Sequence, residues 1–291
     1  HSGTATPAHG NSHAALPRTW QPCYCPLIQP LHFTLYTNML FDSIVYGPIR
    51  SRRLGVSLGM NLMPTTAKLC TFDCVYCECG WNQPVSHPII PTREQVREAL
   101  ASRLIALSPN SIDVITFSGN GEPTLHPEFL GIIEDTCALR DQYCPKAKIS
   151  VLSNSTQLGR QDVVEALRLC DNRILKLDSA IDATMRLIDK PVNTNLTVEQ
   201  IAQWLALFNG DFTLQTCFLR GEYCGQTIDN TTSEELKAWY SMIERLHPQQ
   251  VMIYVIDRAT PLQTLSKVPA AEMEAIAAPL REKGIDVIVS A

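Results

Sequence analysis

The sequence NLMPTTAKLCTFDCVYCECG, residues 61–80, places three cysteines within eight residues. Cys70, Cys74 and Cys77 have the spacing C-x3-C-x2-C, which lets three thiolates turn inward on one compact loop. Thiolates at such spacing suit soft metals, above all iron–sulfur clusters and zinc. Three ligands to a four-iron cube leave one iron without a protein donor, and an open coordination position distinguishes a working metal site from a closed structural one.

The alternative to a cluster is a structural zinc site with Cys79 as the fourth ligand. The spacing Cys77-Glu78-Cys79 is tight for two thiolates that must reach one ion. We therefore expect Cys79 to be a bystander.

A regular alternation of β-rich runs and amphipathic segments surrounds this loop, which is typical of parallel strands joined by helices. The runs predict strands at 56–61, 112–118, 149–153, 173–178, 212–218 and 251–256. Thr92 with Gln95, and Thr197 with Gln200, have the spacing of a helix capping box. Three more helices are predicted from Pro127 to Leu139, after a cap at Ser233, and from Pro269 to Lys283.

Polar residues fall at or just after the carboxyl ends of successive predicted strands, and these are Cys70, Glu122, Ser153, Asn154, Asp178 and Arg220. In a βα barrel those strand ends converge on one mouth, where active sites form. The sequence therefore predicts an α/β fold, a partial (βα)6 TIM-type barrel of parallel strands with outer helices. This barrel domain is expected over residues 39–291. Residues 1–38 begin at His1 and show no strand or helix periodicity, so they are expected to be an irregular, non-native or over-translated extension.

The bulk composition limits the function classes. A net charge of −5 argues against a protein that coats nucleic acid. No apolar run is long enough to span a membrane, so no membrane partner is expected. The chain has 11 cysteines, and their close spacing in the loop favours metal over disulfides, which predicts a reducing cytoplasm.

The motif C-x3-C-x-aromatic-C after the first strand of a βα barrel, with Tyr76 as the aromatic residue, resembles that of the radical S-adenosylmethionine (SAM) superfamily. The resemblance implies a [4Fe–4S] cluster on the three cysteines, with SAM on the fourth iron. It implies reductive cleavage of SAM and a 5′-deoxyadenosyl radical that abstracts hydrogen from a substrate. It also implies an electron donor such as flavodoxin or ferredoxin.

A glycine-rich turn follows the second predicted strand and reads FSGNGEP at residues 117–123. It resembles the glycine-glycine-glutamate motif that binds the amino group of SAM in this superfamily, although Asn120 interrupts the glycines. The resemblance implies that Gly119, Gly121 and Glu122 bind SAM. Ser153 and Asn154, after the third strand, are expected to make polar contacts with the carboxylate or the ribose of SAM.

Three further polar residues lie near the predicted mouth. Lys176 and Asp178 are expected to form either a strand-end salt bridge or a ligand contact. Arg220 is a candidate carboxylate clamp, because a guanidinium group pairs bidentately with carboxylates. His126 is expected to cap a helix.

Three stretches, 47–64, 118–127 and 251–261, resemble the bacterial iron–sulfur oxidoreductase branch grouped with wyosine-type tRNA synthases. That group builds a second cluster on spaced N-terminal cysteines, but residues 1–69 contain only Cys23 and Cys25. Three arginines at positions 50, 52 and 53 could contact RNA phosphates, bind a small anion or pair with acidic neighbours. Among the other cysteines, Cys217 and Cys224 form the one pair considered for an auxiliary cluster.

The sequence thus predicts an enzyme of the radical SAM type. It does not identify the catalytic residues. Its substrate is left open among RNA, including tRNA to be modified, protein and small molecules. One alternative is a glycyl-radical activase that acts on a protein partner, and the other is a zinc-binding module.

Overall fold

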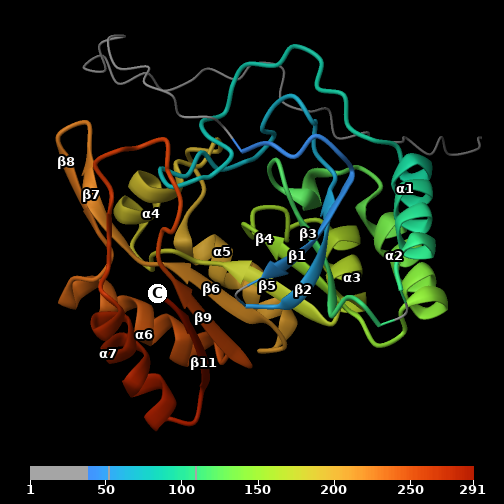
Figure 1. The fold of residues 1–291 in the computed structure, drawn as a ribbon. Coiled ribbons are helices and arrows are strands. Elements are labelled where there is room, and N and C mark those ends of the chain that lie inside the picture. Colours follow the sequence, from blue (N-terminus) through green and yellow to red (C-terminus); the bar gives the residue numbers. More distant parts are fainter. Residues whose placement is uncertain (1–38, 52, 109) are drawn as a thin grey trace, which may run out of the picture.

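The computed structural model describes residues 39–51, 53–108 and 110–291 (Figure 1). The predicted extension at residues 1–38, with Cys23 and Cys25, lies outside the described residues, as does Arg52.

One curled, eight-stranded sheet forms the centre of the molecule, in the order β1-β2-β3-β4-β5-β6-β9-β11. Its strands are β1 (Val45–Ser51), β2 (Gly55–Asn61), β3 (Val114–Ser118), β4 (Lys148–Ser153), β5 (Asn172–Lys176), β6 (Thr213–Cys217), β9 (Gln250–Tyr254) and β11 (Asp286–Ser290). All neighbouring strands from β2 to β11 pair in parallel, and β1 pairs antiparallel with β2. The six predicted strands are therefore confirmed, and the sheet is the partial barrel expected from the sequence.

The two edge strands were not predicted from the sequence. β1 contains Gly47 and Pro48, and its register is irregular between Tyr46 and Ile49. Such residues obscure the alternation of a strand, although an edge strand tolerates proline because one side of its backbone needs no partner. β11 is a run of five residues at the end of the given sequence, where the pattern of a strand followed by a helix cannot be read.

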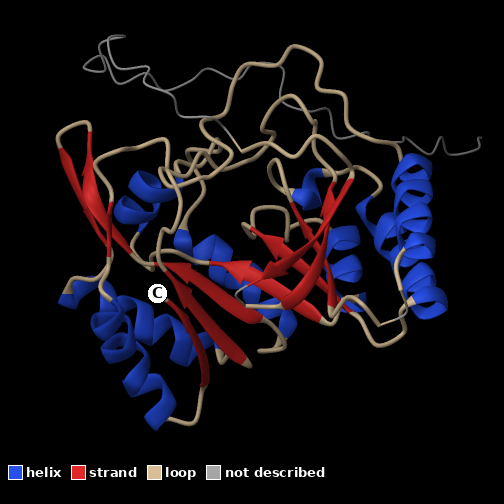
Figure 2. Ribbon diagram, viewed as in Figure 1, coloured by secondary structure: helices blue, strands red, loops and turns tan. Residues whose placement is uncertain are grey.

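Helices lie along the outer side of the curled sheet (Figure 2). They are α1 (Arg93–Ala106), α2 (Phe129–Tyr143), α3 (Gln161–Leu169), α4 (Asp182–Asp189), α5 (Val198–Leu205), α6 (Ser233–Leu246) and α7 (Ala270–Glu282), with short 3-10 turns at Pro123–Leu125 and Ala206–Phe208. No helix in the described ranges is long and apolar enough to cross a bilayer.

The first residues of the helices can be compared with the N-cap residues predicted from the sequence. Thr92 forms the complete capping box with Gln95, and Thr197 accepts a hydrogen bond from the Gln200 amide. The prediction of Ser233 as a cap was wrong by one residue, because the side chain of Thr232 accepts from the Glu235 amide and Ser233 is the first helical residue. The ring of His126 accepts from the Glu128 amide directly before α2, which agrees with its predicted place at a helix start.

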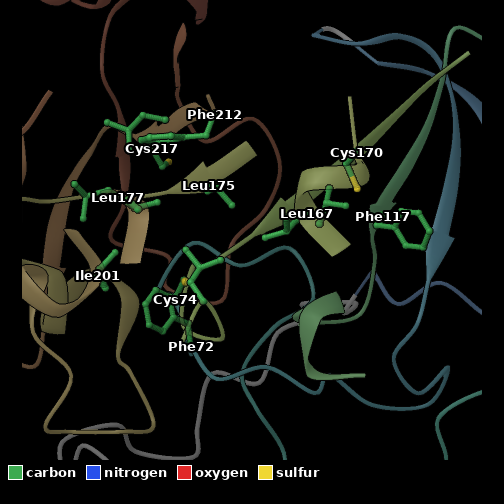
Figure 3. Close-up of a cluster of buried hydrophobic side chains, with 14 of the residues drawn as sticks. Phe72, Cys74, Phe117, Leu167, Cys170, Leu175, Leu177, Ile201, Phe212 and Cys217 are labelled. Carbon is green, nitrogen blue, oxygen red and sulfur yellow. The ribbon is translucent and has the colours of Figure 1, made fainter. Parts of the chain in front are cut away.

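Side chains alternate between the two faces of the sheet, and the two faces differ in chemistry. Leu58, Ile115, Ile149, Leu175 and Leu214 point to the helix side and are fully buried in one apolar cluster. Figure 3 shows part of this cluster, including Phe117, Leu167 and Leu175. The helices are thus held on the sheet by an apolar layer.

The concave face carries polar side chains instead. The hydroxyl groups of Ser57 and Thr116 lie 2.7 Å apart, and the Asn172 amide donates to the Ser150 hydroxyl at 2.8 Å. Gln215 follows on the neighbouring strand. A complete TIM barrel fills its interior with bulky branched residues. This interior also holds Val114, Ile174 and Met252, but its hydroxyl and amide groups make it suited to a polar ligand.

A second, three-stranded sheet extends beyond the end of β6, formed by β10 (Ser266–Lys267), β7 (Leu219–Tyr223) and β8 (Gln226–Asp229). Arg220, the predicted carboxylate clamp, lies on β7, where its guanidinium group pairs with Asp229 and Glu272 of the same chain. Both carboxylates already engage this arginine, so its role in the structure is to join the small sheet to α7.

Candidate functional site

The loop with Cys70, Cys74 and Cys77 follows β2 at the carboxyl ends of the parallel strands. Its backbone is fixed at two places. The Leu69 amide donates to the Asn120 carbonyl at 2.9 Å, and the Glu122 amide returns a bond to the Leu69 carbonyl at 3.0 Å. The Val75 amide donates to Ile188 of α4, also at 2.9 Å. The three cysteines are therefore held between the glycine-rich turn after β3 and the end of α4.

The two glycines of that turn allow this close approach. Gly121 has φ +147°, and a Cβ atom there would lie 1.8 Å from the Leu69 carbonyl oxygen. Gly119 has φ +122°, and its Cβ would lie 2.6 Å from the side-chain oxygen of Asn61. Only glycine adopts such conformations readily and leaves room for the neighbouring chain. Both predicted SAM-site glycines therefore pack the turn against the residues that precede Cys70.

Lys68 lies among the three cysteines, and sequence reasoning missed it. Its side chain is almost fully buried, forms a 3.1 Å ion pair with Asp73 and donates to the Gly80 carbonyl at 3.0 Å. Burial alone would lower the pKa of Lys68, but the neighbouring Cys77 and Cys70, together with Asp73, raise it above its ordinary value. A buried ammonium group there stabilises thiolates, which are the form of cysteine that binds metal. The signal in the sequence was a lone lysine in the apolar segment Ala67–Leu69.

Each thiol has a distinct environment. Burial raises the pKa of Cys70 to about 11, and the Asn154 amide donates to its sulfur at 3.4 Å. Burial also raises the pKa of Cys74, whose thiol lies 3.4 Å from the Asp189 carboxylate. The pKa of Cys77 is lowered, chiefly by a hydrogen bond from the neighbouring Cys79. Cys79 lies beside the triad, and its thiol is 3.3 Å from the Gly119 carbonyl.

The donor set of the loop is three thiols beside a buried ammonium group. In the described ranges, no three side chains among His, Cys, Asp and Glu converge closely enough to hold one metal ion. The cysteines of an iron–sulfur cube bind different iron atoms, so they need not converge on one point. Three loop thiols around a buried cation therefore fit a cluster.

Glu122 connects the glycine-rich turn to the end of β4. Its carboxylate accepts from the Thr124 amide and hydroxyl, from the Ser153 hydroxyl at 2.9 Å and from the Asn154 amide at 2.7 Å. Burial raises the pKa of Glu122 even though these four bonds favour the ionised form. The structure thus brings together Glu122, Ser153 and Asn154, and Asn154 also reaches Thr71 of the cysteine loop at 2.9 Å.

A second buried network adjoins Cys74. The Lys176 ammonium group lies 3.3 Å from the Cys74 sulfur and forms ion pairs with Asp178 at 3.3 Å and Asp189 at 3.5 Å. The predicted strand-end salt bridge is present, and it lies at the cysteine site. Burial alone would lower the pKa of Lys176, but Asp178, Cys74 and Asp189 raise it.

Tyr76 extends this network toward the barrel interior. Its hydroxyl group donates to Asp178 and accepts from Lys176. Its ring meets that of Tyr254 edge-on, with centroids 6.4 Å apart. Sequence reasoning missed Tyr254 and Asp189, because both reach the site from segments more than 100 residues away from the loop.

Asn61, at the end of β2, is a further residue that the sequence did not single out. Its side-chain oxygen accepts from the amides of Met63 and Asn120 at 3.2 and 3.1 Å. These two bonds fix the orientation of the amide, and its buried Nδ2 atom has no acceptor in the described part of the chain. An unpaired buried donor at the mouth suits a bound ligand with an acceptor group.

The remaining cysteines and arginines considered from the sequence lie apart from one another in the structure. Cys217 is fully buried at the end of β6, whereas Cys224 is exposed in the β7–β8 turn, so the structure does not present them as a ligand pair. Arg50 is exposed on β1. Arg53 turns into the barrel, where its guanidinium carbon lies 4.8 Å from the centre of the Tyr254 ring.

Comparison with known proteins gives one family. The model of the radical SAM superfamily matches residues 65–232 of this chain. A UPF0026 protein of Synechocystis sp. is 33% identical over 227 residues, which cover 75% of this chain and 77% of that protein. The GTPase Obg of Brachyspira hyodysenteriae is 27% identical over 234 residues, and the match spans 79% of this chain but only 32% of that protein.

Solved structures show the same fold at low identity. SuiB of Streptococcus suis, bound to S-adenosylmethionine, superposes with a TM-score of 0.57 and 11% identity, over 77% of this chain and 48% of SuiB. TYW1 with a lysine-pyruvate adduct gives a TM-score of 0.55 and 17% identity, over 78% of this chain and 73% of TYW1. At these identities the likeness concerns the fold alone.

Proposed function

Because this chain belongs to the radical SAM superfamily, we propose that it binds a [4Fe–4S] cluster through Cys70, Cys74 and Cys77 and cleaves SAM reductively. The enzymes of this superfamily use these two cofactors and need an electron donor. The observation that carries the proposal is the three-cysteine loop, closed around buried Lys68 at the carboxyl ends of the strands.

A [4Fe–4S] cluster held by Cys70, Cys74 and Cys77 would supply the electron for reductive cleavage of the carbon–sulfur bond of SAM, the chemistry by which this superfamily abstracts hydrogen from a substrate. The protein's part is to bind, orient and shield. Lys68 offsets negative charge on the thiolates, and the Asn154 amide orients the Cys70 sulfur. Cys70 and Cys74 are buried and Cys77 is partly buried, so the loop limits the access of water to the three sulfurs.

We propose that the residues bordering the cysteine loop bind SAM. Gly119 and Gly121 offer backbone groups at close range, and Glu122 offers the carboxylate for an ammonium group. Ser153 and Asn154 hold that carboxylate in place, and Asn154 also donates to the Cys70 sulfur. Tyr76 would border the cofactor on the side of Lys176.

The first test is anaerobic reconstitution of the protein with iron and sulfide. We expect about four irons per chain, a spectral change on addition of SAM, and 5′-deoxyadenosine after chemical reduction. Cys74→Ala should lose most of the iron and all of the product. Cys144→Ala, a buried cysteine at the end of α2, is the matched control and should keep both. Wild-type protein without iron and sulfide after reconstitution would refute the proposal.

The substrate class and the electron donor are the remaining parts of the proposal. A flavodoxin or ferredoxin is the proposed electron donor. The sequence resemblance to the branch grouped with wyosine-type tRNA synthases makes tRNA one candidate substrate, and a glycyl-radical activase would instead act on a protein. No contact among the described residues favours either macromolecule, whereas the hydroxyl and amide groups of the barrel interior favour a small molecule.

A further inference from the structure

A cavity of about 500 Å3 opens at the end of the barrel opposite the cysteines. Its wall includes the first residues of five consecutive parallel strands, which are Val114, Lys148, Asn172, Thr213 and Gln250. Strand register places these residues on the concave face of the sheet. The cavity is therefore the lower part of the barrel interior described above.

The charged side chains of this cavity are mostly cationic. Arg53, Lys146 and Lys148 line it, against a single carboxylate, Asp113. The Asp113 carboxylate already accepts from the Val56 amide at 2.7 Å. Within the described ranges, Lys146 and Lys148 are exposed and make no ion pair or hydrogen bond through their side chains. Three cations that lack a carboxylate partner in the described chain make the cavity suitable for an anion.

Arg53 links this cavity to the cysteine site. Its guanidinium group lies 3.8 Å from the Met252 sulfur and stacks over the Tyr254 ring. The Tyr254 hydroxyl lies 3.4 Å from that of Tyr76. Tyr76 in turn contacts Lys176, which touches the Cys74 sulfur. A continuous chain of side-chain contacts therefore runs from the cavity to the cysteine site.

We infer that the substrate is a small polyanion, a phosphate ester or a polycarboxylate, whose anionic group binds Arg53, Lys146 and Lys148 at the amino ends of the strands. A guanidinium group pairs bidentately with either anion. The rest of the molecule then lies against Asn172, Thr213 and Met252, which line the same cavity. A volume of about 500 Å3 is that of a small-molecule site. That the anion is the substrate rests on the function proposed above, whereas its binding does not.

The experiment is anaerobic titration calorimetry of the reconstituted protein with two probes, pyrophosphate and citrate. We expect saturable binding of at least one probe, with a dissociation constant below about 1 mM that rises with salt. Arg53→Gln should weaken binding about tenfold or more, and Lys148→Gln severalfold. The matched control is Arg50→Gln, on the exposed part of β1 and outside the cavity, and it should bind as wild type does.

The preferred probe identifies the anion class, because pyrophosphate stands for phosphate esters and citrate for polycarboxylates. Lys148 is exposed, so its variant tests the site even if Arg53→Gln fails to fold. Absence of saturable binding, or equal weakening by the Arg50 and Lys148 variants, would overturn the inference. The inference would also be overturned if single-stranded RNA bound to the protein and neither pyrophosphate nor citrate displaced it.

The assay for 5′-deoxyadenosine separates this inference from the proposed function. Product formation without anion binding leaves the proposed function standing and refutes the anion site. Arg53-dependent binding without product keeps the site and refutes the proposed function.

Discussion

Gly121 shows at the scale of one residue why the cysteine loop and the glycine-rich turn form a single unit. Leu69 and Gly121 form a β-bridge, and the Leu69 carbonyl occupies the position that a side chain at 121 would need. The next residue after Leu69 is the first cysteine of the motif. Any change that moves Leu69 therefore moves Cys70.

We predict that Gly121→Ala destabilises the protein by about 3 kcal/mol, since the added Cβ meets backbone rather than a flexible side chain. It should also lower the iron bound after reconstitution. Gly225→Ala is the matched control, because Gly225 also has a positive φ, +74°, but nothing within 4 Å of the new Cβ. We expect it to cost about 1 kcal/mol from backbone strain alone and to keep its iron. Urea unfolding and iron analysis measure both, and equal losses in the two variants would contradict this account.

Lys68 and Lys176 are two lysines that the fold buries, although lysine side chains are usually exposed. Both are buried lysines next to cysteines of the triad, and each also pairs with carboxylates. Their shared effect is to place two fixed positive charges beside thiolates that would otherwise be costly to bury.

At the scale of the elements, α1 and α2 are joined by a bidentate ion pair. The Arg93 guanidinium group donates to the two Asp135 oxygens at 2.7 and 2.9 Å. These hydrogen bonds are the main cause of the lowered pKa of Asp135. Arg93 is 39% exposed, so solvent weakens the pair, and its contribution is about 1 kcal/mol at most.

The lowered pKa sets the direction of a pH effect. A carboxylate whose pKa is lower in the folded state adds stability above its unfolded pKa, near 3.9, and this stability is lost as pH falls through the folded value. We predict that wild type loses stability below about pH 4 more steeply than Asp135→Asn, which has no such proton to bind. Urea midpoints of the metal-free protein across this range test it, with Glu98→Gln on the exposed face of α1 as the control. Parallel pH curves for wild type and Asp135→Asn would count against the pair.

At the scale of the whole molecule, the sheet separates an apolar shell from an interior that mixes polar and apolar side chains. Neighbouring residues of β4 lie on opposite sides of it. Ile149 is fully buried against the helices, and Ser150 accepts from Asn172 in the interior. The shell carries the stability of the fold, and the interior is available for ligand binding.

Substitutions at these two adjacent positions should therefore differ sharply. We predict that Ile149→Ala costs about 3 kcal/mol, from lost burial and the cavity that remains. Ser150→Ala removes one hydrogen bond and should cost about 1 kcal/mol. Chemical denaturation of both variants measures the difference. A larger cost at Ser150 would mean that the polar face is the one that stabilises the fold.

Much of the fold and part of the candidate site could be predicted from short stretches of sequence. The spacing of Cys70, Cys74 and Cys77 is a local property, and the superfamily assignment agrees with it. The alternation of strand and helix patterns predicted six parallel strands and their common mouth, because each pattern is complete within about ten residues. Local patterns missed β1 and β11, where glycine and proline, or the position at the end of the given sequence, removed the signal.

Only the tertiary structure decided which distant residues meet. Asp189 lies 115 residues from Cys74 in the chain, and Met252 lies 199 residues from Arg53, yet each pair is in contact. No spacing rule predicts such contacts, because they arise where strands are ordered side by side and where the loops after them converge. The sequence by itself therefore determined the chemistry of the cysteine loop. The curled sheet decided that hydroxyl and amide groups face its interior, that Lys68 and Lys176 are buried beside the thiols, and that Arg53 faces inward.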